Sequence, residues 1–142
     1  MEERYTSYPT CLYYSANALS RIMTKMADEA FAPTGLSSSY AFLLMTVTES
    51  PGINPKDISC RMKLTPSTIT RLIEKMEYRG FLERRQCGRN TEVFPTKQSQ
   101  KILPLIKKAW ADLYEKYEEI LGKEEARNLT AAIHQAQLKL NI

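Results

Sequence analysis

The chain has 142 residues, of which 43% are hydrophobic and 25% charged, and its formal net charge is +4. This length fits one domain with a core of its own, and this composition excludes an intrinsically disordered chain. Apolar runs are short and the N-terminal MEERYTSYPT is acidic and polar, so the sequence predicts neither a membrane span nor a secretory signal, and we expect a cytoplasmic protein.

The N-terminal part of the chain is predicted to form two helices. Apolar residues recur at spacings of three and four between Pro9 and Phe31, which indicates one long amphipathic helix. The segment FAPTGLSSS interrupts this pattern. Ser37 is placed to cap a second helix, which runs to Glu49.

The next two helices are short and closely spaced. SPGINP closes the second helix, and its Asn54 is a suitable cap for a third helix over about 55–62. Lys63 and Leu64 connect this helix to a fourth, for which Thr65 is the expected cap. Two short helices joined by about three residues outline a helix-turn-helix.

The fourth helix has a buried and an exposed face. Its apolar spacing predicts a buried stripe of Ile69, Leu72, Ile73 and Met76. The core does not need the polar side chains opposite or beside this stripe, which are Ser67, Thr68, Thr70, Arg71, Glu74, Lys75 and Tyr78. Gly80 is expected to end the helix.

A hairpin and two further helices complete the predicted elements. FLERRQ and EVFP indicate two strands around the turn CGRNT, with Arg89 at its tip. Thr96 precedes a long helix that contains Pro104, where we expect a bend, and that ends at Gly122. The last helix, about 123–140, carries an apolar seam. The terminal helices hold more apolar surface than one core can cover, which favours an obligate dimer.

The positive charge is concentrated in one third of the chain. Residues 54–97 contain ten basic and five acidic residues, a net +5, whereas the remainder contains ten basic and eleven acidic residues, a net −1. This distribution fits a basic binding face. Charge alone leaves chance clustering on a solvated surface equally open.

The sequence does not show the residues that metal sites, enzymes and cofactor sites usually need. Three widely spaced cysteines suit reduced thiols, and without a CxxC pair and with His134 as the only histidine we expect no metal site. No nucleophile with a base, carboxylate pair or phosphate-binding glycine loop is recognisable, so we expect neither an enzyme nor a cofactor.

The segment GLSSSYAFLLMTVTESPGINPKDISCRMKLTPSTITRLIEKMEYRGFLERR resembles the winged-helix core of the MarR family of bacterial transcription regulators. The resemblance extends over nearly the whole chain and includes the wing arginine and the PT before the long helix. It implies a mainly α fold: a single domain over 1–142, with a winged helix-turn-helix lobe over about 37–96, a small β-hairpin wing, and dimerisation helices over about 8–31 and 97–140.

The resemblance also implies a function. We expect a sequence-specific transcription regulator, acting as a repressor, that binds a pseudo-palindromic operator in double-stranded DNA as a homodimer and is released by a small-molecule effector. The residues expected to contact DNA are Ser67, Thr68, Thr70, Arg71, Lys75, Arg89, Arg85 and Lys63. For the hydroxyls, helix capping is the alternative, and for Arg89 a mobile surface arginine. Between the adjacent Arg84 and Arg85 the sequence does not decide.

Other features depart from the family pattern or leave alternatives open. The family wing usually carries an acidic residue near the position of Cys87 that helps to orient the arginine, and Lys63 stands where glycine is common. Cys11 suggests a redox-sensing regulator of the same fold, although a half-buried packing role is the commoner explanation. Cys60 is expected to pack and Cys87 to be exposed. A winged helix used only for protein contact is a third possibility.

Overall fold

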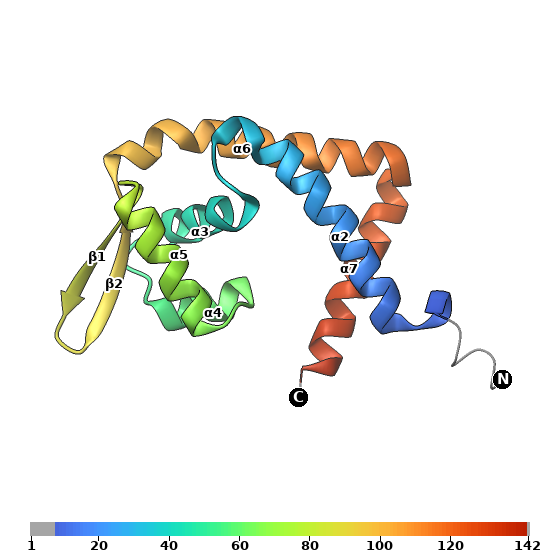
Figure 1. The fold of residues 1–142 in the computed structure, drawn as a ribbon, viewed down its shortest axis with the longest axis horizontal. Coiled ribbons are helices and arrows are strands. Elements are labelled where there is room, and N and C mark those ends of the chain that lie inside the picture. Colours follow the sequence, from blue (N-terminus) through green and yellow to red (C-terminus); the bar gives the residue numbers. More distant parts are fainter. Residues whose placement is uncertain (1–7, 142) are drawn as a thin grey trace.

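Helix α6 (Lys97–Leu121) runs along one side of the molecule and joins a lobe to a pair of arms (Figure 1). The computed structural model describes residues 8–141. The lobe consists of α3 (Ser38–Glu49), α4 (Pro55–Met62), α5 (Pro66–Tyr78) and a hairpin of β1 (Leu82–Cys87) and β2 (Asn90–Pro95). The arms are α2 (Leu12–Phe31) and α7 (Lys123–Leu140). The predicted mainly helical fold with a two-stranded hairpin is confirmed.

The start of the first helix differs from the prediction. A short 3₁₀ turn covers Tyr8–Thr10, and α2 begins only at Leu12, because Cys11 has an extended backbone with φ −84° and ψ 122°. A second 3₁₀ turn, Ala32–Thr34, follows α2. Ser37 precedes α3 as predicted, but its side chain makes no capping hydrogen bond.

Both caps of the helix-turn-helix are confirmed. The side-chain oxygen of Asn54 accepts a hydrogen bond from the Asp57 N–H at 2.9 Å, and Thr65 Oγ1 accepts one from the Thr68 N–H at 3.3 Å. Each of these bonds satisfies a donor at a helix N-terminus that would otherwise lack a partner. Between the helices, Lys63 adopts the left-handed conformation with φ 55°, which allows the sharp turn.

The core lies inside the lobe, between α3, α5, the hairpin and α6. Of the predicted α5 stripe, Ile69, Ile73 and Met76 are buried, and Leu72 is partly buried against them. They pack with fully buried side chains of the other elements, namely Leu43, Leu44, Val47, Ile58, Val93 and Ile106. Burial of each large aliphatic side chain contributes roughly 1.5–3 kcal/mol. The core therefore fixes the opposite face of α5 toward solvent.

The hairpin turn is tighter than predicted. The strands pair from Leu82↔Pro95 to Cys87↔Asn90, which leaves a loop of only Gly88 and Arg89. Gly88 has φ +64°, the conformation that favours glycine at the first position of a two-residue hairpin loop. The base of the hairpin is held to the α3–α4 turn by a bridge between Ile53 and Val93.

The C-terminal helices leave a large apolar surface uncovered. Helix α6 contains Pro104, and Gly122, with φ +89°, separates it from α7 as predicted. In α7 Ala126 is the only residue buried within the described chain, whereas Leu129, Ile133, Leu138 and Leu140 are 39–67% exposed. Among residues 8–141, none of the helices combines the length and the hydropathy of a membrane span.

Candidate nucleic-acid interface

The solvent-facing side of α5 carries the residues predicted from the helical projection. Ser67, Thr70, Arg71 and Lys75 are exposed, and Thr68 is half-buried. No ion pair within the described chain involves Arg71 or Lys75. Their charges are thus available to a partner without the loss of an internal contact.

The hydroxyl groups at the start of α5 have local partners. Thr65 Oγ1 donates to Thr68 Oγ1 at 2.9 Å, and Thr70 Oγ1 donates to the Pro66 carbonyl at 3.0 Å. Ser67 Oγ lies 3.3 Å from Thr65 Oγ1. The helix cap, the alternative role expected for these hydroxyls, is supplied by Thr65, while Ser67 and Thr68 contact its hydroxyl group and Thr70 bonds back to the helix backbone. Each hydroxyl retains capacity for a further hydrogen bond.

Arg89 is exposed at the hairpin tip, as the sequence predicted. It takes part in no ion pair of the described chain. In Figure 1 the hairpin tip and the N-terminal end of α5 both point away from α6. An object that lies along this side of the lobe can meet both elements at once.

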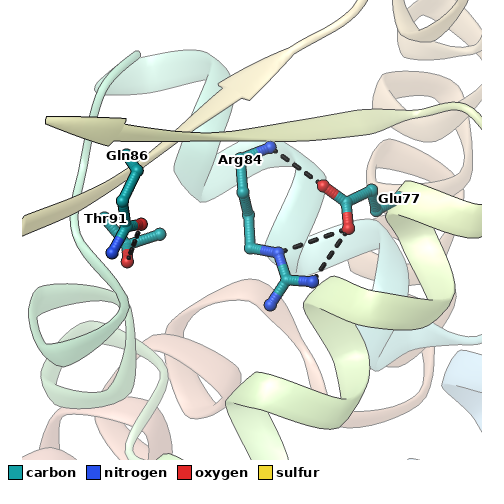
Figure 2. A network of polar contacts seen from close by, with 4 residues as sticks. All are labelled: Glu77, Arg84, Gln86 and Thr91. Carbon is teal, nitrogen blue, oxygen red and sulfur yellow. Dashed lines mark hydrogen bonds and ion pairs between the residues drawn. The ribbon is translucent and has the colours of Figure 1, made fainter.

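Arg84 and Arg85, which the sequence left undecided, face opposite sides of β1. Arg84 binds Glu77 of α5 through its Nη2 at 2.9 Å and its Nε at 3.3 Å (Figure 2). Arg85 donates its Nε to Glu83 at 2.9 Å, and its guanidinium lies 4.2 Å from the centre of the Phe94 ring. Arg84 is thus engaged with the helix, while Arg85 lies on the outer face of the hairpin with 60% of its side chain exposed.

The electrostatic effect of this arrangement is clear at Glu77. Hydrogen bonding from the Arg84 guanidinium lowers the pKa of Glu77 below its ordinary value of 4.5, with further lowering by the Arg84 backbone N–H and charge. The carboxylate is therefore ionised at neutral pH. Sequence patterns do not indicate this pair, since helix periodicity treats Glu77 as a flanking charge and strand alternation does not say which face of β1 meets α5.

Lys63 is exposed in the turn between α4 and α5 and joins no ion pair in the described part of the chain. Its ammonium group lies on the connection that leads into the N-terminus of α5. The left-handed backbone, with φ 55° and ψ 41°, accounts for the glycine that the family often has there.

The cysteines differ from the expectation in two cases. The sequence predicts a half-buried Cys11 and a packed Cys60, but both are exposed in this chain. Cys60 lies on the solvent side of the short helix α4, away from Ile58, which fills the core instead. Cys87 is exposed as predicted, and desolvation followed by the nearby Glu92 carboxylate raises the pKa of its thiol.

A pocket of about 1030 Å³ lies between α3 and α6. Its apolar part comes from Met45, Trp110, Ala111 and Tyr114, and its charged rim from Glu49, Lys107, Glu115, Glu118, Glu119 and Lys123. The tyrosines and methionines of α2 do not line it. The helical pattern of α6 places Trp110 and Tyr114 one turn apart, but only the packed structure shows that α3 faces them.

Comparisons with known proteins agree with this geometry. The MarR family model matches residues 36–91. The HTH-type transcriptional regulator YwoH of Bacillus subtilis is 30% identical over 92 residues, which cover 63% of this chain and 67% of YwoH. A second regulator from that organism, YybA, is 23% identical over 122 residues, 84% of this chain and 81% of YybA.

Solved structures show the same fold. The transcriptional repressor CouR bound to p-coumaroyl-CoA superimposes with a TM-score of 0.84 at 18% identity, covering 95% of this chain and 96% of CouR. CouR bound to a 23-mer DNA duplex gives a TM-score of 0.81, also at 18% identity, over 89% and 92% of the two chains. With the winged helix-turn-helix in place and a relative of 30% identity, the chain belongs to the MarR family of DNA-binding transcription regulators.

Proposed function

We propose that the protein is a sequence-specific repressor that binds a pseudo-palindromic operator as a homodimer and is released by a small-molecule effector. It acts through binding and not through catalysis. The observation that carries this proposal is the pair of exposed guanidinium groups, Arg71 on α5 and Arg89 at the hairpin tip, neither of which has an ion-pair partner in the described chain.

Each guanidinium fits a different groove of the duplex. Arg71 follows the N-terminal turn of α5, the part of a recognition helix that meets base edges in the major groove, and its two parallel donors match guanine O6 and N7. Arg89 stands on a narrow two-residue turn that can enter the minor groove, where a narrow A·T tract concentrates negative potential. The remaining candidates, Ser67, Thr68, Thr70, Lys75, Arg85 and Lys63, would contact phosphates or flanking bases.

The homodimer is supported by the uncovered apolar faces of the arms. Helix α7 buries one side chain within the described chain, and α2 exposes Leu12, Tyr13 and Ile22 by 59–80%. Two copies that cover these faces would form a dimerisation region from 8–31 and 97–140, with the lobe of 37–96 on each side. A two-fold dimer reads two half-sites about 34–36 Å apart on one face of the duplex.

The pocket between α3 and α6 supports release by an effector. It lies where the lobe meets the long helix that leads to the arms, so a molecule bound there would alter the angle between them. CouR, which shares this fold, has been solved with p-coumaroyl-CoA and with DNA. A thiol-based signal remains the alternative, because Cys11 is exposed.

The test is selection of bound duplexes from random DNA, followed by titration of the selected duplex at two salt concentrations. The proposal predicts an enriched inverted repeat and an affinity that falls steeply with salt, because phosphate neutralisation releases counterions. A protein-contact module with the same fold would enrich no sequence.

A further inference from the structure

Glu77, near the end of α5, receives three hydrogen bonds from a single residue of the wing. The Arg84 backbone N–H donates to one carboxylate oxygen at 3.1 Å, while Nε and Nη2 donate to the other at 3.3 and 2.9 Å (Figure 2). Bonds from both the main chain and the planar guanidinium restrain orientation as well as distance. They therefore restrain the angle at which β1 leaves the recognition helix.

Strand β2, the other edge of the hairpin, is also attached to the lobe, at the residue that pairs with Arg84. Arg84 pairs across the sheet with Val93, and Val93 exchanges main-chain bonds with the α3–α4 turn: its N–H donates to the Ile53 carbonyl at 3.0 Å and its carbonyl accepts from the Gly52 N–H at 2.8 Å. One edge alone would let the hairpin rotate about that edge. On the β1 side Leu82 is buried at the base of the hairpin, and the Glu77 carboxylate adds a polar attachment two residues further along the strand.

The same face of β1 continues this restraint toward the tip. Gln86 lies two residues beyond Arg84, on the same side of the strand, and its side-chain oxygen accepts a bond from Thr91 Oγ1 at 2.8 Å (Figure 2). This bond joins β1 to β2 one residue pair before the loop. The restraint thus extends from α5 almost to Arg89.

Arg89 itself has no carboxylate to hold its side chain within the described chain, and the neighbouring residues are Gly88 and Asn90. The direction in which Arg89 points is consequently set by the hairpin as a whole. Arg85 cannot contribute to the α5 contact, because it lies on the other face of the strand with Glu83 and Phe94.

We propose that Glu77 and Arg84 are positioning residues for DNA recognition, which hold the wing at the angle that lets Arg89 enter the minor groove while Arg71 lies in the major groove. The inference rests on the proposed DNA-binding function. Without this contact the hairpin has to be ordered on binding, and that cost lowers affinity. Because both side chains are 36% exposed, the loss should be on the order of two- to fivefold.

The test compares Glu77→Gln with a matched control, Asp112→Asn, which removes the exposed Lys108–Asp112 pair of α6. The glutamine side chain would keep an oxygen for the Arg84 N–H but lose the ionic contact. Dissociation constants are measured by fluorescence anisotropy on the duplex selected by the wild-type chain, in the presence and absence of Arg89→Ala. Thermal unfolding of each variant checks the fold.

We expect Glu77→Gln to weaken DNA binding two- to fivefold with little change in the unfolding midpoint. In a chain that already carries Arg89→Ala, Glu77→Gln should cause no further loss of affinity. The double exchange Glu77→Arg with Arg84→Glu should restore part of the affinity. A merely structural contact would give the same loss with or without Arg89, and that additivity would overturn the inference. Equal binding by Glu77→Gln and Asp112→Asn would overturn it as well. If the wild-type chain selects no duplex, the proposed function fails and the inference falls with it.

Discussion

The ring of Phe42 on α3 meets the indole of Trp110 on α6 edge to face, with the ring centroids 6.0 Å apart and the planes at 69°. Phe42 makes a second edge contact, at 5.6 Å, with the buried Phe31 at the end of α2. These three aromatic rings connect α3 of the lobe to the arm α2 and to the long helix α6. Trp110 also lines the pocket between α3 and α6.

Replacement of Trp110 by alanine should lower the free energy of unfolding by about 2–3 kcal/mol, because it removes an aromatic contact and a large apolar group that is 38% exposed. Trp110→Phe should recover most of this loss. Tyr78→Ala is the control, since Tyr78 is 94% exposed and should leave stability unchanged. The measurement is urea denaturation followed by circular dichroism. Equal stability of the two alanine variants would contradict the stabilising role of Trp110.

Arg71 and Arg89 should differ in what their loss does to DNA binding. Arg71→Ala should cost about 1–3 kcal/mol on the preferred duplex and relax the preference at one base pair per half-site. Arg89→Ala should weaken binding more evenly across duplexes that share an A·T-rich minor groove. Both variants are titrated against selected and scrambled duplexes at one salt concentration, with Lys139→Ala on α7 as a control of equal charge change. Unchanged affinity and selectivity of Arg71→Ala would exclude α5 as the reading element.

The apolar surface of the arms predicts a stable dimer. Ending the chain before Lys123 should remove part of the interface, and Ile133→Glu should place a charge in the α7 seam, where Ile133 is 42% exposed in one chain. Light scattering should give a dimer for the full chain and smaller species for both variants, with Gln135→Glu, at an exposed polar position of α7, as control. A well-folded monomer of the full chain would contradict the prediction.

Local signals predicted most of the lobe and the break between α6 and α7. The caps Asn54 and Thr65, the α5 stripe and the Gly122 break all follow from residues close in sequence, and the structure has them at the predicted positions. The wrong assignment of Cys60 has a different origin. Whether Cys60 packs depends on which side of an eight-residue helix meets the core, and so short a helix gives little periodicity.

The candidate site also has features that the local sequence predicts and features that depend on how elements pack together. Helical projection identified Arg71 because exposure is a property of one helix, whereas the contact between Glu77 and Arg84 depends on how a strand crosses a helix end. The turn was predicted as CGRNT but has only Gly88 and Arg89 as its loop, because strand pairing continues through Cys87 and Asn90. Cross-strand pairing of polar residues leaves no apolar alternation in the sequence that would mark it.

Cys11 provides a test of the redox alternative. Mild peroxide should leave DNA binding by the wild-type chain unchanged, and Cys11→Ser should behave in the same way, because an exposed thiol alone does not make a sensor. Binding is followed by anisotropy before and after peroxide, with reductant added last to reverse sulfenic acid or disulfide. Release of DNA by peroxide that the single substitution abolishes would identify Cys11 as the sensor and replace the small-molecule signal proposed above.

Lys63 should show opposite effects on stability and on DNA binding. Its backbone has φ 55°, a conformation that costs a residue with a Cβ about 1–2 kcal/mol and costs glycine very little. Glycine also has greater freedom in the unfolded chain, which offsets part of this gain. Lys63→Gly should therefore stabilise the fold by about 0.5–1 kcal/mol. If the ammonium group contacts a phosphate, the same substitution should weaken binding to all duplexes alike. The slope of log affinity against log salt concentration should then fall by an amount that corresponds to about one released counterion. Lys63→Ala separates the two effects, because it removes the charge and keeps the strained backbone: it should lose affinity as Lys63→Gly does, without the gain in stability. Urea denaturation and titration at two salt concentrations measure both quantities, and an alanine variant that binds like the wild-type chain would exclude the phosphate contact while leaving the backbone argument intact.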